Sequence, residues 1–355
     1  MKQTLISQRQ QRGLTLVELM IGLLVGMLVI GAVLYVFLGS RLTYKYNDTM
    51  GRIQENGRVA IEMIGQDVRM AGFIGCRRLA AYLPPPSATG SISAESIYFS
   101  DDFTNAIKTN LGLSELNLAD KGFVFSQEID DQVEGTDSLA VLAGSTEIPL
   151  AGLMADGAAA IVTSETVPAG PAIVSDCRFD RLSLSDTAPS GVPASAEAFL
   201  VSTEGKTIAH AGYAFQRAYD TDASITPISA VSYSIRETGR TDSDGNAVRS
   251  LFRNGDELIE GARDLCVRYG VAENSSNEAV AEYVEADDVG DWKQVIAIRI
   301  ELLLASVDDN SVDTAAAVPT LCDRPVPDED DRVFDRRMYK VFSTTVGLRN
   351  QVRQP

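Results

Sequence analysis

The feature that most constrains this chain is a long apolar run near its amino terminus. Residues Leu14–Leu38 contain a single charged residue, Glu18. As a helix, a run of this length is long enough to cross a hydrocarbon core of about 30 Å. The preceding segment, Met1–Gly13, carries three bases and no acid. Because basic residues stay on the cytoplasmic side, the sequence predicts a cytoplasmic leader, one membrane-spanning helix and an exported carboxy-terminal domain.

An ordinary secretory signal fits this arrangement poorly. Such a signal places a short apolar run before a small-residue cleavage site, and the run is then removed. Here the apolar run is longer, and Gly13 lies before it. Glu18 lies inside the run, where an unpaired carboxylate costs about 2–4 kcal/mol. That cost indicates either a partner for Glu18 or a side chain that reaches the nearby membrane interface.

The composition is that of a folded protein that does not wrap nucleic acid. The 355 residues are enough for one large domain or two modest ones, and 45% of them are hydrophobic. Forty-nine acidic residues against 31 basic residues give a formal charge of −18. Since nucleic-acid binding needs a basic surface, we predict no nucleic-acid partner.

The sequence offers little for catalysis. It has one histidine, His210, which excludes metal sites built from several histidines. We expect His210 to be a surface residue. No glycine-rich phosphate-binding loop and no serine-nucleophile motif is present in the sequence. We therefore predict no catalytic residue, no metal and no cofactor, and a protein that is not an enzyme.

The helix is expected to continue beyond the apolar run. Apolar or small residues recur there at steps of three and four, with charged residues between them, which predicts one buried stripe. The stripe consists of Met50, Ile53, Gly57, Ile61, Ile64, Val68 and Ala71. No proline lies between Leu14 and Phe73, so one nearly continuous helix is predicted.

The rest of the chain is predicted to form strands and long loops. Short apolar or alternating runs mark the strands Asp137–Ala143, Ala172–Ser175, Ala230–Arg236, Val248–Arg253, Gln294–Ala305 and Met338–Leu348. Residues 242–246 lack the full ligand series of a calcium loop and instead predict a hairpin turn. The fold class is therefore α+β, with a long helix packed on a mainly antiparallel sheet.

The amino terminus resembles a known processing motif. Gly13-Leu14-Thr15-Leu16-Val17-Glu18 is similar to the prepilin cleavage motif of the type IV pilin superfamily. The resemblance implies that a prepilin peptidase cuts between Gly13 and Leu14 and that Leu14 becomes N-methylated. Most members have phenylalanine where this chain has Leu14. The resemblance also implies that Glu18 pairs with the terminal ammonium of a neighbouring subunit during assembly, which would remove the cost of its buried charge.

Several later segments resemble PilW-type minor pilins of the same superfamily. They are Met70–Cys76, Ser175–Cys177, Leu251–Arg253, Gly261–Gly270, Trp292 with Gln294–Ala305, and Leu348–Asn350. The resemblance implies a low-abundance subunit that primes a type IV pilus or forms part of its tip. Its partners would be other minor pilins, the major pilin, the inner-membrane assembly machinery and, before assembly, membrane lipid. Two alternatives stay open: a pseudopilin of a type II secretion tip, and a pilus-borne adhesin or ligand-binding module.

These inferences define four regions: a cleaved leader (1–13), a transmembrane or fibre-core helix (14–38), its amphipathic continuation (39–75) and an extracytoplasmic β-rich domain (76–355). The protein is expected in the inner membrane with a single span, and then in the fibre or at its tip. Export makes two disulfides the natural state of the four cysteines, which permit three pairings. Their placement favours Cys76–Cys177 and Cys266–Cys322.

Overall fold

The computed structural model describes residues 15–75, 78–79, 96–155, 157–176, 181–185, 196–210, 212–272, 279–308, 311–312, 314–324 and 334–350. The predicted cleavage site at Gly13 and Leu14 lies outside these residues, as do Cys76 and Cys177 and therefore the pairing predicted for them. By internal contacts the chain divides into two compact units, Met1–Arg52 and Ile53–Pro355.

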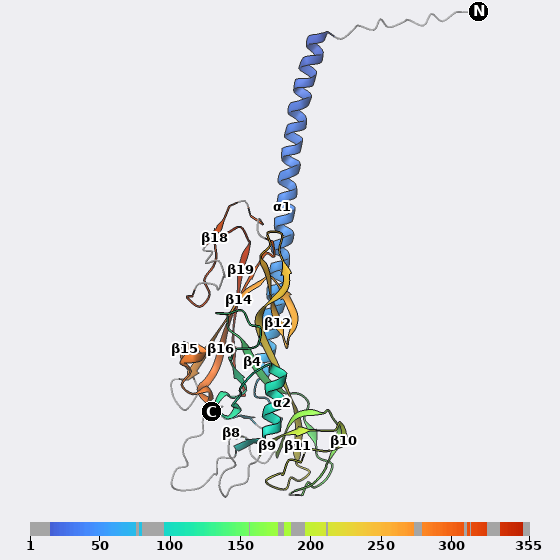
Figure 1. Cartoon of the computed structure of the whole chain (residues 1–355), viewed down its shortest axis with the longest axis vertical. Helices are drawn as coiled ribbons and strands as arrows, with labels where there is room; N and C mark the ends of the chain where they lie inside the picture. Colours follow the sequence, from blue (N-terminus) through green and yellow to red (C-terminus); the bar gives the residue numbers. More distant parts are fainter. Residues whose placement is uncertain are drawn as a thin grey trace, which may run out of the picture. The chain divides into compact units, whose positions relative to one another are not determined.

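The predicted continuous helix is confirmed as α1, Leu16–Met70 (Figure 1). An 18-residue window near its start has a mean hydropathy of 2.7 and is not buried at all, so by length and composition this helix can cross a membrane. Its last part, in the second unit, buries one stripe: Ile53, Gly57, Ala60, Ile64, Gly65 and Val68. Of the seven residues predicted for the stripe, Met50 and Ile61 are only half-buried, whereas Ala60, which was not predicted, is fully buried. Small residues occupy the centre of the stripe because the helix approaches the β domain closely there.

Within the described residues, eleven strands form the largest sheet. They are β1 (Arg78–Leu79), β2 (Ser96–Phe99), β3 (Val124–Phe125), β4 (Leu139–Gly144), β5 (Ile148–Pro149), β7 (Gly170–Asp176), β8 (Arg181–Ser185), β9 (Ala196–Val201), β11 (Ala223–Thr241), β12 (Ala247–Arg253) and β13 (Asp256–Glu260). The order along its main path is β1-β8-β2-β9-β7-β11-β12-β13. The long strand β11 links two regions, since its first residues pair with β5 and β7 and its later residues with β4 and β12.

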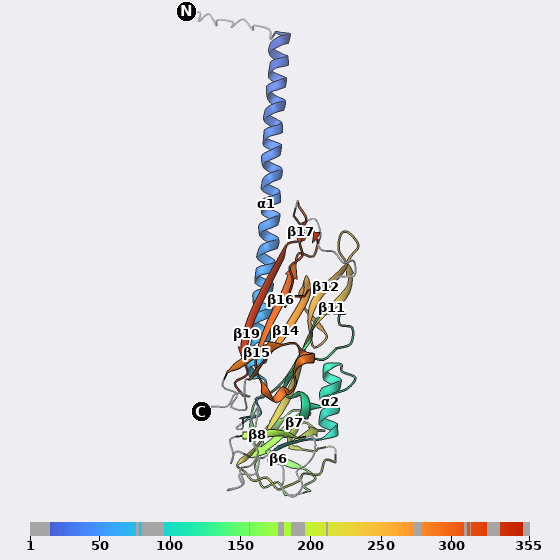
Figure 2. The ribbon, with the colours of Figure 1, turned by 90° about the vertical axis from the view of Figure 1, so that its left-hand side faces the viewer.

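A second sheet has the order β15-β14-β16-β19 (Figure 2). Its strands are β14 (Ala262–Ala272), β15 (Val280–Val284), β16 (Val295–Ala305) and β19 (Tyr339–Gly347). The predicted alternation of β16 is confirmed in the middle of the strand, whereas both faces are buried at its two ends. Ile298, Ile300 and Leu302 are buried, whereas Arg299 between them is exposed. Antiparallel pairing places Leu302 opposite Phe342, so both side chains share one face.

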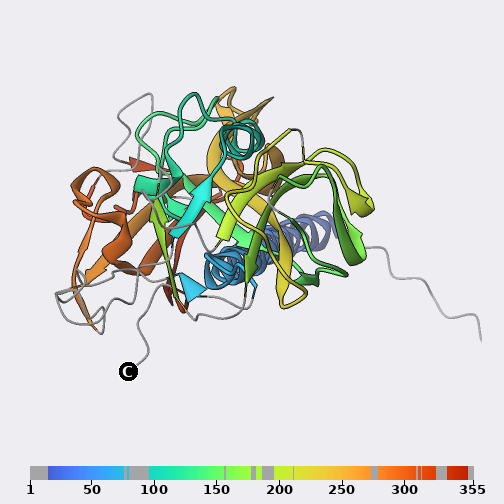
Figure 3. The ribbon, with the colours of Figure 1, turned by 90° about the horizontal axis from the view of Figure 1, so that it is seen from below.

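A lobe at the first residues of β11 has its own apolar core. Besides β5, β7 and β9 it contains β6 (Ile161–Val167) and β10 (Gly205–Ile208), which pair antiparallel. Figure 3 shows the ribbon of the chain from below, with these strands in green and yellow. The helix α2 (Asp101–Leu111) contacts β7, β9 and β11. The remaining described elements are α3 (Leu118–Lys121), η1 (Ala286–Asp288), η2 (Trp292–Gln294), β17 (Ala316–Ala317) and β18 (Phe334–Asp335).

The helix α2 was not predicted from the sequence, although its ends carry standard signals. The Ser100 hydroxyl accepts a hydrogen bond from the Phe103 amide and caps the first turn. Gly112 ends the helix in the left-handed conformation, with φ 69°. Phe103, Ile107 and Leu111 recur every four residues and are buried. The predicted α+β class is nevertheless confirmed, with parallel pairing confined to β1–β8, β2–β8 and β2–β9 among the named strand pairs.

Candidate assembly site

The first described turn of α1 forms a capping box. The Glu18 amide donates to the Thr15 hydroxyl at 3.2 Å. In return, the Glu18 carboxylate accepts from the Thr15 amide and hydroxyl, both at 3.3 Å. This reciprocal pattern of threonine and glutamate three residues apart satisfies amide groups that have no partner inside the helix. The carboxylate of Glu18 is thus held at the start of α1, directly before the exposed apolar residues.

The end of α1 that belongs to the β domain is fixed in register along β19. A side chain on Gly57 would overlap the Phe342 ring, so the helix backbone and the ring are in close contact. Gly65 lies similarly near Val346, where a Cβ atom would stand 3.8 Å from a valine methyl. The eight residues from Gly57 to Gly65 and the four residues from Phe342 to Val346 each span about 12–14 Å, so the two contacts are equally far apart on the helix and on the strand. The helix therefore runs alongside β19.

Three polar side chains join α1 to the large sheet. The Tyr233 hydroxyl on β11 donates to the Asp67 carboxylate at 2.5 Å. Arg253 on β12 donates to the same Asp67 oxygen, with Nη2 at 3.0 Å and Nε at 3.2 Å. Burial, together with the hydrogen bond to Asp67, raises the pKa of Tyr233. This role of Asp67 was not predicted from the sequence, because both partners lie more than 160 residues away.

The carboxy-terminal end of α1 is tied down by backbone groups. The Asn350 side-chain amide donates to the Ala71 carbonyl at 2.8 Å, and the Gly72 backbone amide donates to the Leu142 carbonyl on β4 at 3.0 Å. Gly72 has φ 69°, a conformation that favours glycine at a helix end. The end of the helix is thus bound to the large sheet and to the turn that follows β19.

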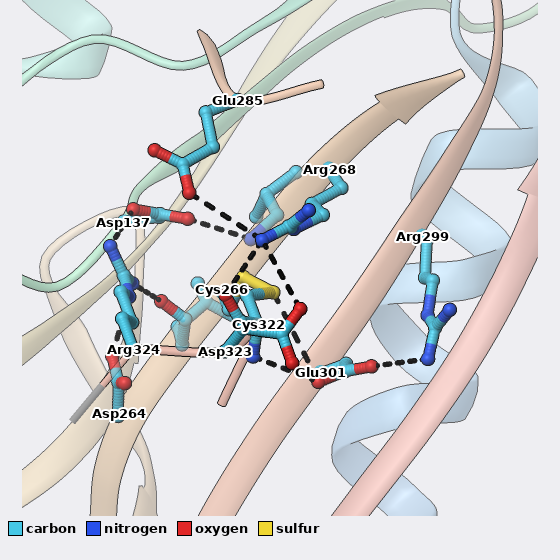
Figure 4. Close-up of a disulfide and its surroundings, with 12 residues drawn as sticks. Asp137, Asp264, Cys266, Arg268, Glu285, Arg299, Glu301, Cys322, Asp323 and Arg324 are labelled. Carbon is cyan, nitrogen blue, oxygen red and sulfur yellow. Dashed lines mark hydrogen bonds and ion pairs between the residues drawn. A yellow bond between two sulfur atoms is a disulfide. The ribbon is translucent and has the colours of Figure 1, made fainter. Parts of the chain in front are cut away.

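The structure contains the disulfide that the sequence analysis favoured for the second half of the domain, Cys266–Cys322 (Figure 4). It links the segment 314–324 covalently to β14. Leu303 and Leu321 are buried against the disulfide. The Arg268 guanidinium also donates to the Cys322 carbonyl at 2.6 Å. Since 56 residues separate the two cysteines, the cross-link removes substantial freedom from the unfolded chain.

Arg324, two residues beyond the disulfide, bridges two aspartates. Its guanidinium lies 2.9 Å from Asp137 and 3.4 Å from Asp264 (Figure 4). Asp264 is fully buried, and its second oxygen has no hydrogen-bond partner. Burial raises the pKa of Asp264 to about 7, although Arg324 opposes the shift. This carboxyl is therefore poised to change its protonation state near neutral pH.

A second buried cation, Arg337, holds the β11–β12 hairpin. Its guanidinium pairs with Asp242 at 2.5 Å, and their side chains are 4% and 1% exposed. Burial alone would raise the pKa of Asp242, but hydrogen bonds from Asn246, Arg337 and Asp244 outweigh it and lower the pKa to about 2. The predicted hairpin turn at 242–246 is confirmed, and its first carboxylate is occupied by Arg337.

The lobe formed by β5–β7, β9 and β10 contains buried polar groups that the sequence analysis did not identify. His210 was expected at the surface but is buried; its Nε2 lies 2.6 Å from the Ala158 carbonyl, and its ring packs against Phe215. Glu197 is buried as well and accepts hydrogen bonds from Tyr213 at 2.7 Å and Tyr219 at 3.0 Å. Burial raises the pKa of Glu197. Both side chains are used in packing the lobe.

An open hollow of about 500 Å³ lies beside α2. Its lining is mostly polar and contains no base: Phe99, Asp101, Thr104, Asn105, Leu116, Asn117 and Leu118. Asp101, Thr104 and Asn105 share one face of α2, because they are three and four residues apart. Among the described residues no group of three or more histidine, cysteine, aspartate or glutamate side chains is arranged to hold a metal ion.

Two segments of the chain match known protein families, one at the amino terminus and one in the β domain. Residues 8–34 match the prokaryotic N-terminal methylation motif. Together with the apolar start of α1, this match fits a membrane-anchored pilin. Residues 233–350 match the type IV pilus-assembly protein W family, PilW. No curated protein and no solved structure matches the chain.

The chain thus carries the motif and the domain of a type IV pilus minor pilin of the PilW type, as the sequence resemblance predicted. The family is a structural component of pili, which implies association with other pilus components. The matched segment begins at Tyr233, which bonds to Asp67, and ends at Asn350, which bonds to Ala71. The PilW segment therefore contains the residues of the β domain that bond to Asp67 in α1 and to Ala71 directly after it.

Proposed function

We propose that the chain is a minor pilin that primes assembly of a type IV pilus or forms part of its tip. The observation that carries this proposal is the continuity of α1. The helix that starts within the methylation motif is the same helix whose later residues pack on the PilW segment. One continuous helix would then connect the processed terminus to the domain exposed on the fibre.

Processing would remove residues 1–13 between Gly13 and Leu14, and Leu14 would be N-methylated. Residues 14–38 would form the membrane-spanning and later fibre-core helix, residues 39–75 its amphipathic continuation, and residues 76–355 the extracytoplasmic domain. The subunit would reside in the inner membrane with a single span before it enters the fibre or its tip. Prepilin peptidase and the inner-membrane machinery would be its first partners, followed by other minor pilins and the major pilin.

Glu18 would act as the assembly residue. Among the described residues its carboxylate accepts from Thr15, one helical turn away. In a fibre the same carboxylate would pair with the terminal ammonium of a neighbouring subunit. An ion pair in an apolar bundle removes the cost of an isolated charge, so that insertion is favourable only where a neighbour is present.

The protein would act through assembly rather than catalysis, since the buried titratable groups described above are engaged in packing. A pseudopilin of a type II secretion tip is the nearest alternative, and the PilW match favours the pilus. A pilus-borne ligand-binding module is supported only by the polar hollow beside α2.

The test is to express the full chain with and without prepilin peptidase and to determine its amino terminus by intact mass and peptide sequencing. We expect a peptidase-dependent start at Leu14 that carries a methyl group. Gly13→Leu should stay uncut, whereas Glu18→Gln should be cut but should fail to restore pili in a strain that lacks the gene. An intact Met1 in the presence of the peptidase, or a cut after Leu38, would contradict the proposal.

A further inference from the structure

The charge pattern of α1 changes abruptly after its apolar run. Between Glu18 and Asp48 the chain has only two charged residues, Arg41 and Lys45, and both are positive. This is unusual in a chain with a formal charge of −18. Four aromatic residues accompany the two bases, and together they are here called the collar: Tyr35, Phe37, Arg41, Tyr44, Lys45 and Tyr46.

The collar surrounds the helix rather than following one face. Phe37, Arg41 and Lys45 recur every four residues and share one face with Tyr44, whereas Tyr35 and Tyr46, eleven residues apart, lie on the opposite face. The Arg41 guanidinium stacks over the Phe37 ring at 5.4 Å. All four aromatic side chains are exposed, from 45% at Tyr46 to 82% at Tyr35. Aromatic residues on opposite faces of the helix suit a lipid bilayer, which surrounds the helix. A single docked protein would contact aromatic residues on one face.

The two bases of the collar have no acidic partner among the described residues. The next base along the helix behaves differently, since Arg52 pairs with Asp48 at 3.1 Å. Arg41 and Lys45, one helical turn apart, therefore present two free positive charges on the same side. Their position also runs against the usual bias, because lysine and arginine are generally enriched on the cytoplasmic side of a span, and these two follow it.

The spacing of charges along α1 matches the thickness of a bilayer. Glu18 and Arg41 are about 23 residues and hence about 34 Å apart along the helix. The hydrocarbon core is about 30 Å thick, so if Glu18 lies near one interface, Arg41 lies just beyond the other. Lys45 follows about 6 Å further on, within the headgroup layer. Tyrosine is enriched at this depth, where its ring is apolar and its hydroxyl reaches water.

We propose that the collar binds the phosphate groups of anionic phospholipid at the outer face of the membrane. Arg41 and Lys45 supply the positive charge, and the tyrosines fix the depth of the helix. This inference rests on the proposed membrane insertion of α1 and adds to it a specific lipid class. Since the binding is electrostatic, it weakens with salt, and the subunit must release these lipids when it leaves the membrane.

The experiment compares the full chain in nanodiscs of phosphatidylcholine alone and in nanodiscs that also contain phosphatidylglycerol. Amide hydrogen exchange is followed in two peptides, one within residues 19–34 and one within residues 39–48. We expect exchange in 39–48 to slow several-fold with phosphatidylglycerol, and the effect to fade at high salt. Inorganic phosphate added to the phosphatidylcholine discs should have no effect, which separates a lipid headgroup from a free anion.

The collar variant is Arg41→Gln with Lys45→Gln, and the matched control is Arg52→Gln, which removes a base that already has a partner. The double variant should lose the response to phosphatidylglycerol, and the control should keep it. Protection of 19–34 without a lipid-dependent change in 39–48 would overturn the collar proposal and leave the membrane span intact. Fast exchange of 19–34 in all discs would overturn the insertion on which it rests, and the collar proposal with it.

Discussion

Polar side chains are used differently in the two units of the molecule. In the first unit they bond within one helical turn, as Thr15 does with Glu18 and Asp48 with Arg52. In the second unit, bonds of this local kind are joined by others between residues far apart in sequence. Asp67 and Arg253 are separated by 186 residues, and Asp242 and Arg337 by 95. The first unit is thus specified locally, whereas the second depends on contacts that form only when the whole β domain folds.

This difference has an energetic consequence. A local pair on an exposed helix contributes a few tenths of a kcal/mol, because water competes for both charges. A buried pair leaves an uncompensated charge when one partner is removed, which costs several kcal/mol. Substitutions should therefore affect stability little in the first unit and strongly in the second. The single tryptophan, Trp292, is buried in the β domain against Tyr269 and reports its unfolding.

The largest effect is expected for Arg337→Ala. The substitution leaves the buried Asp242 carboxylate without its cation and removes the donors to the Ser306 and Val307 carbonyls. We expect the free energy of unfolding to fall by about 3–5 kcal/mol. The measurement is denaturant unfolding of the full chain in detergent, followed by the fluorescence of Trp292.

Two further variants show whether the buried charge is the cause. Asp242→Asn added to Arg337→Ala should recover part of the loss, because it removes the stranded carboxylate. Arg349→Ala, at an exposed position, should change stability by less than about 0.5 kcal/mol. Equal losses at Arg337 and Arg349 would remove the contrast between buried and exposed charges.

A smaller effect is expected where α1 meets β19. Gly57→Ala forces the Phe342 ring to move, which costs about 1–3 kcal/mol, whereas the gain in helix propensity is about 1 kcal/mol. Gly65→Ala meets its nearest atoms at 3.8 Å, an ordinary contact, and should stabilise by up to about 1 kcal/mol. The same unfolding assay should give opposite signs for the two glycines. Changes of the same sign would mean that the helix does not approach β19 as closely as described.

The contrast between local and distant contacts also explains what the sequence could predict. The length of α1, the alternation of β16 and the β11–β12 hairpin follow from periodicity and turn residues alone. The helix α2 was predictable in the same way, from Ser100, Gly112 and the apolar spacing between them. These features need no knowledge of any other segment.

The remaining features depend on the tertiary fold. Nothing in the local sequence distinguishes Asp67 from the exposed acids of α1, because its partners lie on β11 and β12. The same holds for Ala60, whose burial in place of Ile61 follows from the close approach of the helix to the sheet. His210 lies in a polar stretch of sequence, yet the core around Phe215 encloses it. Such side chains acquire their roles only from neighbours brought together by folding.

The smallest effect concerns Asp264 and the pH dependence of stability. Its pKa is raised to about 7 by burial, from an ordinary value of 3.8, so near neutral pH the folded chain holds a proton that the unfolded chain has released. The free energy of unfolding should therefore fall as pH rises through 7, by about 1 kcal/mol between pH 6 and pH 8. Asp264→Asn should flatten this part of the profile.

Because the two chains share every other titratable group, the difference between their unfolding profiles isolates Asp264. If the free energy of unfolding falls more steeply from pH 6 to pH 8 in the wild-type chain, ionisation of the buried, incompletely hydrogen-bonded Asp264 carboxyl destabilises the fold. Identical slopes would mean that Arg324 compensates the charge fully at 3.4 Å. In that case Arg324 would keep the Asp264 carboxyl ionised at neutral pH, as Arg337 and the other donors do for Asp242.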